Sequence, residues 1–293
     1  MNIKVYLKQR KELVDEYIKY VFPIHDQPEK IHEALWFSMF EGGKRIRPII
    51  MLAIADLAGV GLERVLNAAA GIEMIHSSTL ILDDLPSMDD ALIRRGKPAL
   101  HKVYGESTAI LTANILMLDG LKLITEDLIK SLEDRERLLE INQDVFEEIG
   151  KEGVMLGQFL DLSFSGKSVN KREIEEIHRR KTSSLFILSS KVAALLCGFK
   201  QDQVTALVNY AESFGMVFQI SDDLLALEGA TSKTGKFSLR NDVSPNYISA
   251  IGEKESRKKM NDCTKKAISN IKVFKKEGEA LIELVKLLKG RSA

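Results

Sequence analysis

The distribution of proline constrains the fold of this chain more than any other feature. Five of the six prolines lie in the first hundred residues, the sixth is Pro245, and none occurs over residues 99–244. Proline breaks helices because it lacks a backbone donor, so a long interval without it can hold several uninterrupted helices. Apolar residues in this interval recur at three- and four-residue spacings, as in Ile174, Ile177 and Leu185, with little strict alternation. The pattern predicts an all-α fold.

Length and composition indicate one domain with a sizeable core. The chain has 293 residues, of which 45% are hydrophobic, and this is enough for a large buried interior. Its glycine and proline clusters mark helix boundaries, but none has the length of a flexible linker, so residues 1–293 are expected to form a single domain. The helix expected over residues 68–76 is apolar nearly all round, which places it inside a helical bundle.

Charge and cysteine content exclude several function classes. The 42 basic and 42 acidic residues balance, so bulk charge directs the protein neither to nucleic acid nor to an acidic membrane. Two cysteines are too few for a disulfide framework and fit a reducing compartment. No run approaches the roughly 18 apolar residues of a membrane span, and the N-terminal residues lack the apolar core of a signal peptide. We expect a cytoplasmic protein without a membrane span, unless a targeting segment has been removed.

Four carboxylates lie in the eight-residue run DDLPSMDD, residues 83–90, where an apolar helix is expected to end. A helix C-terminus already carries partial negative charge, so Asp83 and Asp84 require a nearby cation. Oxygen ligands without histidine or cysteine suit Mg²⁺, which completes its coordination shell with water and substrate phosphate. A solvated acidic turn is the alternative for a cluster that stands alone.

A second aspartate pair favours the metal site over the solvated turn. Asp222 and Asp223 again lie in an apolar helical stretch, and Gln219 shares their helix face. Burial of two such pairs without partners would be prohibitive, so they either pair with lysine and arginine or meet across a cavity that holds metal.

Short basic groups complete this pattern. They contain Lys44, Arg45, Arg47, His76, Arg94, Arg95, Lys97, Lys181, Lys233 and Lys236. Metal-binding carboxylates together with separate arginine and lysine sets are what two diphosphate groups require, one bridged by Mg²⁺ and the other held by guanidinium and ammonium groups. The sequence contains no GxxxxGK[ST] phosphate loop.

With these motifs the chain resembles the trans-isoprenyl diphosphate synthases, the polyprenyl synthetase family that includes farnesyl and geranylgeranyl diphosphate synthases. The resemblance runs from about Lys30 to Gly252, in family order and spacing, through GGKRIRP, EMIHSSTLILDDLPSMD, RRGKP, GQFLDL, KTSSL and FQISDDLL. It implies helices around a deep central cavity and usually a homodimer. Four residues between Asp84 and Asp89 resemble the first motif of bacterial and plant short-chain enzymes.

The resemblance implies a role for each matching position. The expected metal ligands are Asp83, Asp84, Asp89 and Asp222, with Asp223 as a further candidate. The residues expected to hold the allylic diphosphate are Arg94, Lys181 and Lys236. Those expected to hold isopentenyl diphosphate are Lys44, Arg47, His76 and Arg95. Those expected beside the reacting carbons are Thr182 and Gln219, and less certain supporting roles fall to Gln158 and Asp161.

The chemistry implied by the family is head-to-tail prenyl transfer. Three Mg²⁺ ions, with Mn²⁺ as an alternative, and the cationic side chains would stabilise departing pyrophosphate while the allylic C–O bond ionises. The isopentenyl double bond then attacks the carbocation, and loss of a proton leaves a chain that is five carbons longer. Because water would quench the cation, the reaction needs a buried pocket.

The second motif departs from the family pattern. The family sequence DDxxD ends here in Ala226, the aspartate that often follows Gly235-Lys236 is Phe237, and a later lysine is Ser244. Since Asp222 is the main ligand of that motif, we expect activity to survive with weaker affinity for Mg²⁺ or the allylic substrate. The alternative is a catalytically impaired homologue that acts as a subunit or regulator of a hetero-oligomer.

Product length depends on the residues beneath the first motif. In the family a bulky aromatic residue five positions before the first aspartate limits growth to about C15. Here that position is Ser78, with Thr79 beside it, so small side chains favour the C20 product. Met74, Ile75, Leu111 or a residue of a dimer partner could still close the pocket, and C15 remains the alternative.

Two other protein classes fit less well. A class I terpene cyclase would not need the isopentenyl set Lys44, Arg47 and His76. A non-enzymatic helical interaction protein would have no use for two aspartate pairs together with two cation sets. The other histidines are expected to be surface or packing residues: His25, His32, His101 and His178.

Overall fold

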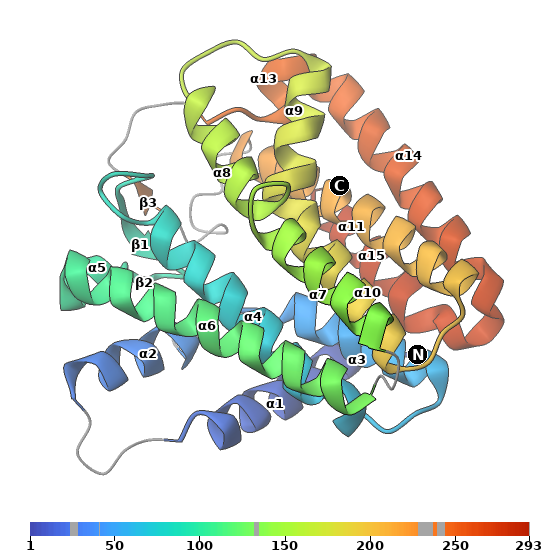
Figure 1. Ribbon diagram of the computed structural model, residues 1–293. Helices are drawn as coiled ribbons and strands as arrows, with labels where there is room; N and C mark the ends of the chain where they lie inside the picture. Colours follow the sequence, from blue (N-terminus) through green and yellow to red (C-terminus); the bar gives the residue numbers. More distant parts are fainter. Residues whose placement is uncertain (24–28, 41, 132–134, 228–236, 239–243, 293) are drawn as a thin grey trace.

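The computed structural model describes residues 1–23, 29–40, 42–131, 135–227, 237–238 and 244–292 (Figure 1). The first half contains α1 (Ile3–Val21), α2 (Lys30–Phe40), α3 (Ile46–Ala58), α4 (Glu63–Asp83), β1 (Ala91–Arg94), β2 (Lys97–Pro98), α5 (Leu100–Tyr104), α6 (Glu106–Ser131) and α7 (Arg135–Ile149). The second half contains α8 (Val154–Ser163), α9 (Lys171–His178), the π-helical turn η1 (Arg179–Ser183), α10 (Ser184–Leu196), α11 (Gln201–Leu227), β3 (Phe237–Ser238), α13 (Tyr247–Ile251), α14 (Glu253–Ile271), the 3₁₀ helix η2 (Lys272–Gly278), α15 (Glu279–Lys289) and the 3₁₀ turn η3 (Gly290–Ser292). The all-α prediction is confirmed.

The helix boundaries follow the glycine and capping signals in the sequence. Gly59 ends α3 with a positive φ of 68°, a conformation that glycine adopts at little cost. At the start of α9, the Asn170 side chain accepts from the backbone N–H of Glu173 while the Glu173 carboxylate accepts from the backbone N–H of Asn170, which satisfies two otherwise unpaired donors. This capping box fixes the start of the helix that leads into η1.

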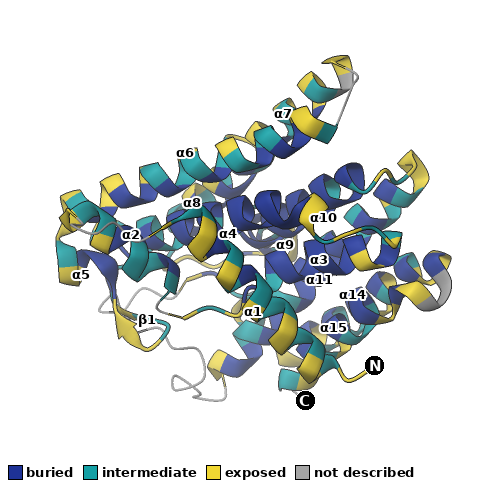
Figure 2. Cartoon of the chain, turned by 90° about the horizontal axis from the view of Figure 1, so that it is seen from below, coloured by how far each residue is buried: buried dark blue, intermediate teal, exposed yellow. Residues whose placement is uncertain are grey.

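The core lies between inner helices that are buried on most sides. Figure 2 shows α3 and α10 almost entirely buried, whereas α1, α6 and α7 carry exposed residues. As predicted, α4 is an interior helix, and it packs on α6 through two glycines. A Cβ at Gly71 would lie 2.5 Å from the carbonyl oxygen of Gly120, so the two helix backbones are in direct contact. Buried apolar side chains from α1 to α15 form one contiguous cluster.

Two helices are long and apolar enough to meet a length and composition criterion for a membrane span, α4 and α6, among the described residues. The most apolar window of α4 is 78% buried inside the protein, as befits a core helix, whereas that of α6 is 33% buried. The outer face of α6 is therefore apolar and exposed.

A small sheet, which the helical periodicity did not predict, lies beside the bundle. β1 pairs antiparallel with β2 and with β3, in the order β2-β1-β3, with Ala91 opposite Ser238. β1 follows the first aspartate run in sequence and β3 follows the second. The sheet thus connects the two segments that come after the aspartate pairs (Figure 1).

Candidate active site

One cavity collects most of the predicted site residues. Its volume is about 1390 Å³, and its walls come from α4, α8, η1, α11, the loop before α3 and the segment around residues 244–249. The predicted residues that line it are Lys44, Arg47, His76, Thr79, Asp83, Asp89, Arg94, Arg95, Lys181, Thr182, Gln219, Asp222 and Asp223. Asp84 and Ser78 do not line it, and Lys236 lies outside the described residues. The two aspartate pairs therefore meet across a cavity, as the sequence predicted.

The first aspartate run forms a compact turn at the end of α4. The backbone N–H of Asp89 donates to the carbonyl of Asp83 over 2.9 Å, and that of Ala91 donates to the carbonyl of Asp84 over 3.1 Å. These bonds fold the run back on itself, so that Asp83 and Asp89 reach the same cavity wall. Residues six apart in sequence thereby present two carboxylates to one site.

Asp84 instead forms a buried ion pair with Arg94. The Nε atom of Arg94 donates to both carboxylate oxygens over 3.0 Å, and Nη2 adds a further contact to Oδ1. The Asp84 side chain is only 4% exposed. Burial alone would lower the pKa of Arg94, but its bonds to Asp84 outweigh this and raise that pKa. Asp84 thus serves as the counter-ion of Arg94 in this state.

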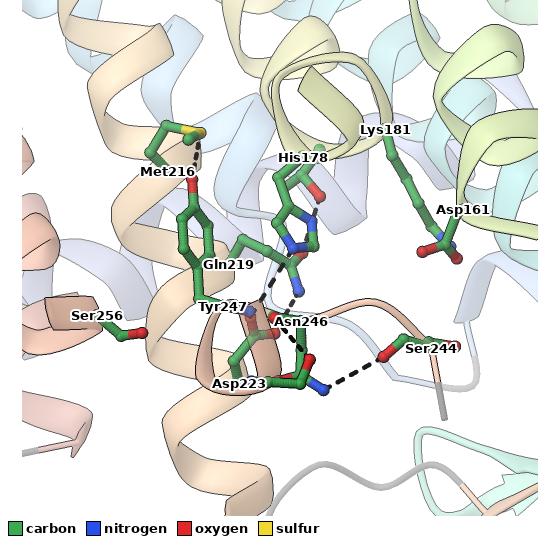
Figure 3. Close-up of polar contacts among 12 residues, drawn as sticks. Asp161, His178, Lys181, Met216, Gln219, Asp223, Ser244, Asn246, Tyr247 and Ser256 are labelled. Atoms are coloured by element: carbon green, nitrogen blue, oxygen red, sulfur yellow. Dashed lines mark hydrogen bonds and ion pairs between the residues drawn. The ribbon is translucent and has the colours of Figure 1, made fainter. Parts of the chain in front are cut away.

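The two members of the second pair also make different contacts, and Figure 3 shows those of Asp223. Asp222 lies 3.4 Å from Nη2 of Arg291, and burial raises the Asp222 pKa, with Arg291 opposing. Both oxygens of Asp223 accept hydrogen bonds, Oδ1 from Nε2 of Gln219 and Oδ2 from the backbone N–H of Tyr247, each over 2.8 Å. Burial raises the pKa of Asp223 to about 6. Asp223 therefore connects α11 to the start of α13.

Ala226 lies on the cavity wall one helical turn beyond Asp222. Its methyl group occupies the place where the family carries a third carboxylate of the second motif, and a methyl group cannot ligate metal. The carboxylate that the sequence predicted to be missing from the second motif is therefore missing from the cavity wall.

Lys181 and Thr182 lie in the π-helical turn η1. The Lys181 ammonium donates to Oδ2 of Asp161 on α8 over 2.6 Å. Burial would lower the pKa of Lys181, but Asp83, Asp161 and Asp89 raise it well above its ordinary value. The Thr182 hydroxyl donates to Oε1 of Gln219 over 2.8 Å. Asp161, which the sequence left as a less certain supporting residue, anchors the cavity lysine.

Two of the residues expected to hold isopentenyl diphosphate are a buried arginine and a neutral histidine. Arg47 stacks over the Phe186 ring at 4.2 Å, and its Nε atom has no hydrogen-bond partner; burial lowers its pKa to about 10. Burial, with Arg47 the largest of four arginine contributions, lowers the pKa of His76 well below its ordinary value. Both side chains face the cavity.

The loop before α3 is held by Arg45, which the sequence placed in a basic group but to which it assigned no individual role. Arg45 is 2% exposed. Its Nε atom donates to Asp15 of α1 over 2.7 Å, and Nη1 donates to Glu73 of α4 over 2.9 Å. Arg45 also takes a left-handed backbone conformation at φ 54°. These bonds join α1, α4 and the loop, and so they fix where Lys44 and Arg47 stand.

Two buried polar side chains on the cavity wall have no hydrogen-bond partner among the residues that the structure describes. They are His178 and Gln158, which are 3% and 9% exposed. His178 packs on the Tyr247 ring with centroids 5.2 Å apart, in keeping with the expected packing role, but its Nε2 also faces Asp223 at 3.8 Å. Burial lowers the His178 pKa to about 3. In the sequence, His178 precedes Thr182 by four residues, about one helical turn. This spacing could have indicated that His178 lies on the same wall of the cavity.

The residues expected to set product length differ in position. Thr79 lines the cavity, whereas Ser78 is fully buried away from it. Ser78 lies seven residues after Gly71, on the helix face that packs against α6. Of the two residues predicted to set product length, only Thr79 therefore reaches the cavity, and its effect on product length stays a prediction. Leu111, offered as a residue that could close the pocket, is 57% exposed and does not line it.

The carboxylate arrangement suits an ion shared with a ligand. Within the described residues, no group of three or more His, Cys, Asp or Glu side chains is placed to hold a metal on its own. Mg²⁺ usually binds through one or two carboxylates and completes its shell with water and substrate phosphates. Asp83 and Asp89 on one wall and Asp222 on the other provide such partial sites.

Comparisons with other proteins agree with this geometry. The sequence model described as polyprenyl synthetase matches residues 28–288. The chain is 33% identical to farnesyl diphosphate synthase of Bacillus subtilis, covering 98% of this chain and 97% of that protein. It is 34% identical to geranylgeranyl diphosphate synthase of Cyanophora paradoxa, covering 99% and 97%. A solved geranyltransferase from Legionella pneumophila superimposes with a TM-score of 0.86 at 29% identity, covering 99% and 98%.

Proposed function

The chain belongs to the polyprenyl synthetase family and is a short-chain trans-prenyltransferase, and we propose that it condenses isopentenyl diphosphate with an allylic diphosphate in the cavity between the two aspartate pairs. The observation that carries the proposal is the meeting of carboxylates and two cation sets on one enclosed surface. Neither a helical interaction protein nor a terpene cyclase requires both sets.

The allylic diphosphate is assigned to the side of the cavity that carries Lys181. Its ammonium stays protonated because three carboxylates surround it, so it can neutralise a phosphate oxygen without proton exchange. Arg94 lies beside the same wall, and Lys236 keeps its predicted role. Mg²⁺ bound between these carboxylates and the diphosphate would supply the Lewis acid that stabilises departing pyrophosphate.

Isopentenyl diphosphate is assigned to the opposite cation set. Arg47 at the start of α3 lines the cavity. Lys44, in the loop before α3, and Arg95, in the turn between β1 and β2, line it as well. His76 remains neutral among the arginines, so it can donate one hydrogen bond to a phosphate oxygen without adding another positive charge. Fixed donors aimed at an anion need no reorganisation when it binds.

The reacting carbons are assigned to the region of Thr182 and Gln219. The Thr182 proton is committed to Gln219, and the Gln219 amide is oriented by Asp223. The Thr182 oxygen thus has lone pairs that are free to face a developing cation. Apolar side chains on α8 and α11, including Phe159 and Phe218, line the same cavity and help to exclude water from the carbocation.

The metal ligands are proposed to be Asp83 and Asp89 on one wall and Asp222 on the other. Three Mg²⁺ ions would bind together with the substrates, with Mn²⁺ as an alternative ion. Asp84 would join them if Arg94 released its carboxylate to contact the diphosphate.

The proposed product is C20, with C15 as the alternative. Thr79 is the small residue of α4 that faces the cavity near the first motif, and it leaves space where a larger side chain would limit growth. The relatives at 33% and 34% identity carry both product names, so the comparisons do not favour either length.

The assembly is proposed to be a homodimer of single-domain chains in the cytoplasm. Large apolar side chains are exposed along α6 and α7, with Leu118 66%, Ile129 57% and Phe146 57% exposed. Exposed apolar side chains on neighbouring helices are a surface that a second copy of the chain could cover. The single contiguous core supports one domain.

The test is incubation of the purified protein with Mg²⁺, isopentenyl diphosphate and, separately, C5, C10 and C15 allylic diphosphates. Mass spectrometry of the products should show a dominant C20 species, and a chelator should abolish turnover. A dominant C15 species would correct the product length alone. A folded protein that binds pyrophosphate but extends none of the primers would contradict the proposal and support the impaired-subunit alternative.

A further inference from the structure

Lys181 and Thr182 stand in η1, a π-helical turn inside an otherwise continuous helix from α9 to α10. The backbone N–H of Ser184 donates to the carbonyl of Arg179, five residues earlier. A π turn has poorer geometry than the α-helix, is rare, and occurs mostly at functional sites. Contacts from outside the helix should therefore favour this form of the turn.

Helix α8 contacts η1 through a glycine. A Cβ added to Gly157 would lie 2.2 Å from the backbone nitrogen of Lys181 and 2.5 Å from its Cα. Backbone atoms cannot swing aside as a flexible side chain can, so only glycine permits this approach. Four residues later, on the same face of α8, Asp161 accepts from the Lys181 ammonium over 2.6 Å.

Helix α11 also contacts η1 through a glycine, at Ser183. A Cβ added to Gly215 would lie 2.4 Å from Oγ of Ser183 and 2.7 Å from its Cα. Four residues later, Gln219 accepts from the Thr182 hydroxyl over 2.8 Å. Gln219 is in turn oriented by Asp223 (Figure 3).

Each helix therefore contacts η1 twice, at the backbone through a glycine and at a side chain through a polar residue one turn further on. Glycine inside a helix is less favourable than alanine, so both helices give up stability at the positions where they approach the turn. The polar bonds can keep their lengths only if the backbones stay this close.

We propose that Gly157 and Gly215 are positioning residues of the prenyl transfer reaction. Their close approach sets where Lys181 and Thr182 stand in the cavity relative to the diphosphate and the reacting carbons. The inference rests on the proposed function, because it takes Lys181 and Thr182 to act on substrate.

Gly157→Ala tests the contact from α8. The added methyl group must separate α8 from η1 and so displace Lys181. We expect the KM for the allylic diphosphate to rise and kcat to fall, together by about tenfold or more, because a misplacement of about 1 Å can cost about 100-fold. Calorimetric titration with inorganic pyrophosphate and Mg²⁺ should show weaker binding, while the KM for isopentenyl diphosphate changes little.

Gly215→Ala tests the contact from α11. Because Thr182 is assigned to the reacting carbons and not to a diphosphate, this variant should lower kcat with little change in either KM. A fall in kcat of about tenfold is the expected scale for a displaced group at the reacting centre. Equal kcat values for the folded variant and the unchanged protein would overturn the assignment for Gly215.

Gly71→Ala is the matched control. Its Cβ would lie 2.5 Å from the carbonyl oxygen of Gly120, a backbone clash of the same kind, but at the contact between α4 and α6 and away from the cavity lining. It should lower the unfolding temperature and leave the kinetic constants of the folded fraction unchanged. If its folded fraction lost activity as Gly157→Ala does, the positioning role would be overturned.

Asp161→Asn keeps the inference testable if Gly157→Ala does not fold. It retains the backbone contact and weakens only the bond to Lys181, so the allylic KM should rise and pyrophosphate binding should weaken. Unchanged values would overturn the contact from α8. Absence of turnover in the unchanged protein would instead contradict the proposed function, since every variant is compared with that protein.

Discussion

The two aspartate pairs of the cavity differ in how their charge is balanced. In the first pair, Arg94 forms two bonds of 3.0 Å to Asp84, whose side chain is 4% exposed. In the second, Arg291 approaches Asp222 at a single contact of 3.4 Å, and 35% of the Asp222 side chain is exposed. The first pair therefore has a tightly bound arginine counter-ion, whereas the arginine beside the second pair makes only a loose contact.

In both pairs, one aspartate is bound within the protein and its neighbour in sequence faces the cavity. In the first pair Asp84 is bound within the protein and Asp83 faces the cavity. In the second pair both oxygens of Asp223 are used within the protein, and Asp222 is the accessible member. Consecutive helical residues point about 100° apart, so one member of a pair can support the wall while the other meets the ligand. The predictions below test this division.

Asp83→Ala should have the largest effect on turnover. It removes the cavity-facing carboxylate of the first pair, which also stabilises the Lys181 ammonium. Loss of one preorganised electrostatic group at a reacting centre costs about 100- to 1,000-fold in kcat, and we expect that scale in the initial rate of prenyl transfer. Asp90→Ala is the control, because Asp90 belongs to the same run but pairs with Lys102 at 3.7 Å and does not line the cavity. Comparable losses in both variants would show that the effect does not depend on a carboxylate that faces the cavity.

Asp222→Asn and Asp223→Asn should separate the two roles in the second pair. Asp222→Asn should raise the Mg²⁺ concentration for half-maximal activity, because it weakens a proposed ligand. Asp223→Asn replaces one acceptor oxygen with a donor that faces Gln219 or Tyr247, so kcat should fall by about tenfold, the effect of leaving buried hydrogen-bonding groups unsatisfied. The Mg²⁺ dependence of that second variant should stay close to that of the unchanged protein. The same shift in Mg²⁺ dependence for both variants would show that both aspartates ligate metal.

The sequence predicted the fold and most of the cavity because both depend on local pattern. Helical spacing reports burial directly, and the cavity residues were predicted from two aspartate pairs, short basic groups and motifs that resemble a known family. The rotation of α4 was not predictable in the same way. It decides that Thr79 and not Ser78 reaches the cavity, and one residue turns a side chain by about 100°.

Other features depend on contacts between distant segments. The periodicity of residues 174–195 runs through η1 without revealing the π turn, which requires Gly157 and Gly215 from two other helices. The pairing of Arg94 with Asp84 and that of Arg45 with Glu73 also depend on how the chain folds back. Sequence identified these arginines as cations of the site but could not tell which would be engaged by the protein.

Ala226→Asp should make the second wall more similar to the first in the number of carboxylates that it presents to the cavity. The new carboxylate would lie on the cavity one turn after Asp222 and would increase the negative charge available to Mg²⁺. We expect the Mg²⁺ concentration for half-maximal activity to fall by about tenfold or less, the scale of one added charge-assisted contact, with little change in kcat. Ala226→Asn, of similar size but without the charge, should leave the Mg²⁺ dependence unchanged. Equal behaviour of the two variants would indicate that the missing carboxylate has no bearing on metal affinity.

Arg291→Ala should have the smallest effect, and its sign distinguishes two roles for that guanidinium. As a counter-ion of Asp222, Arg291 competes with Mg²⁺ for the carboxylate, so its removal should strengthen the apparent Mg²⁺ affinity. The single contact of 3.4 Å involves side chains that are 24% and 35% exposed, and such a pair contributes about 0.2–1 kcal/mol, or at most about fivefold. Titration of initial rates with Mg²⁺ measures this change. A higher Mg²⁺ requirement would mean that Arg291 supports the metal-bound state, and the second wall would then depend on a fixed arginine as the first does.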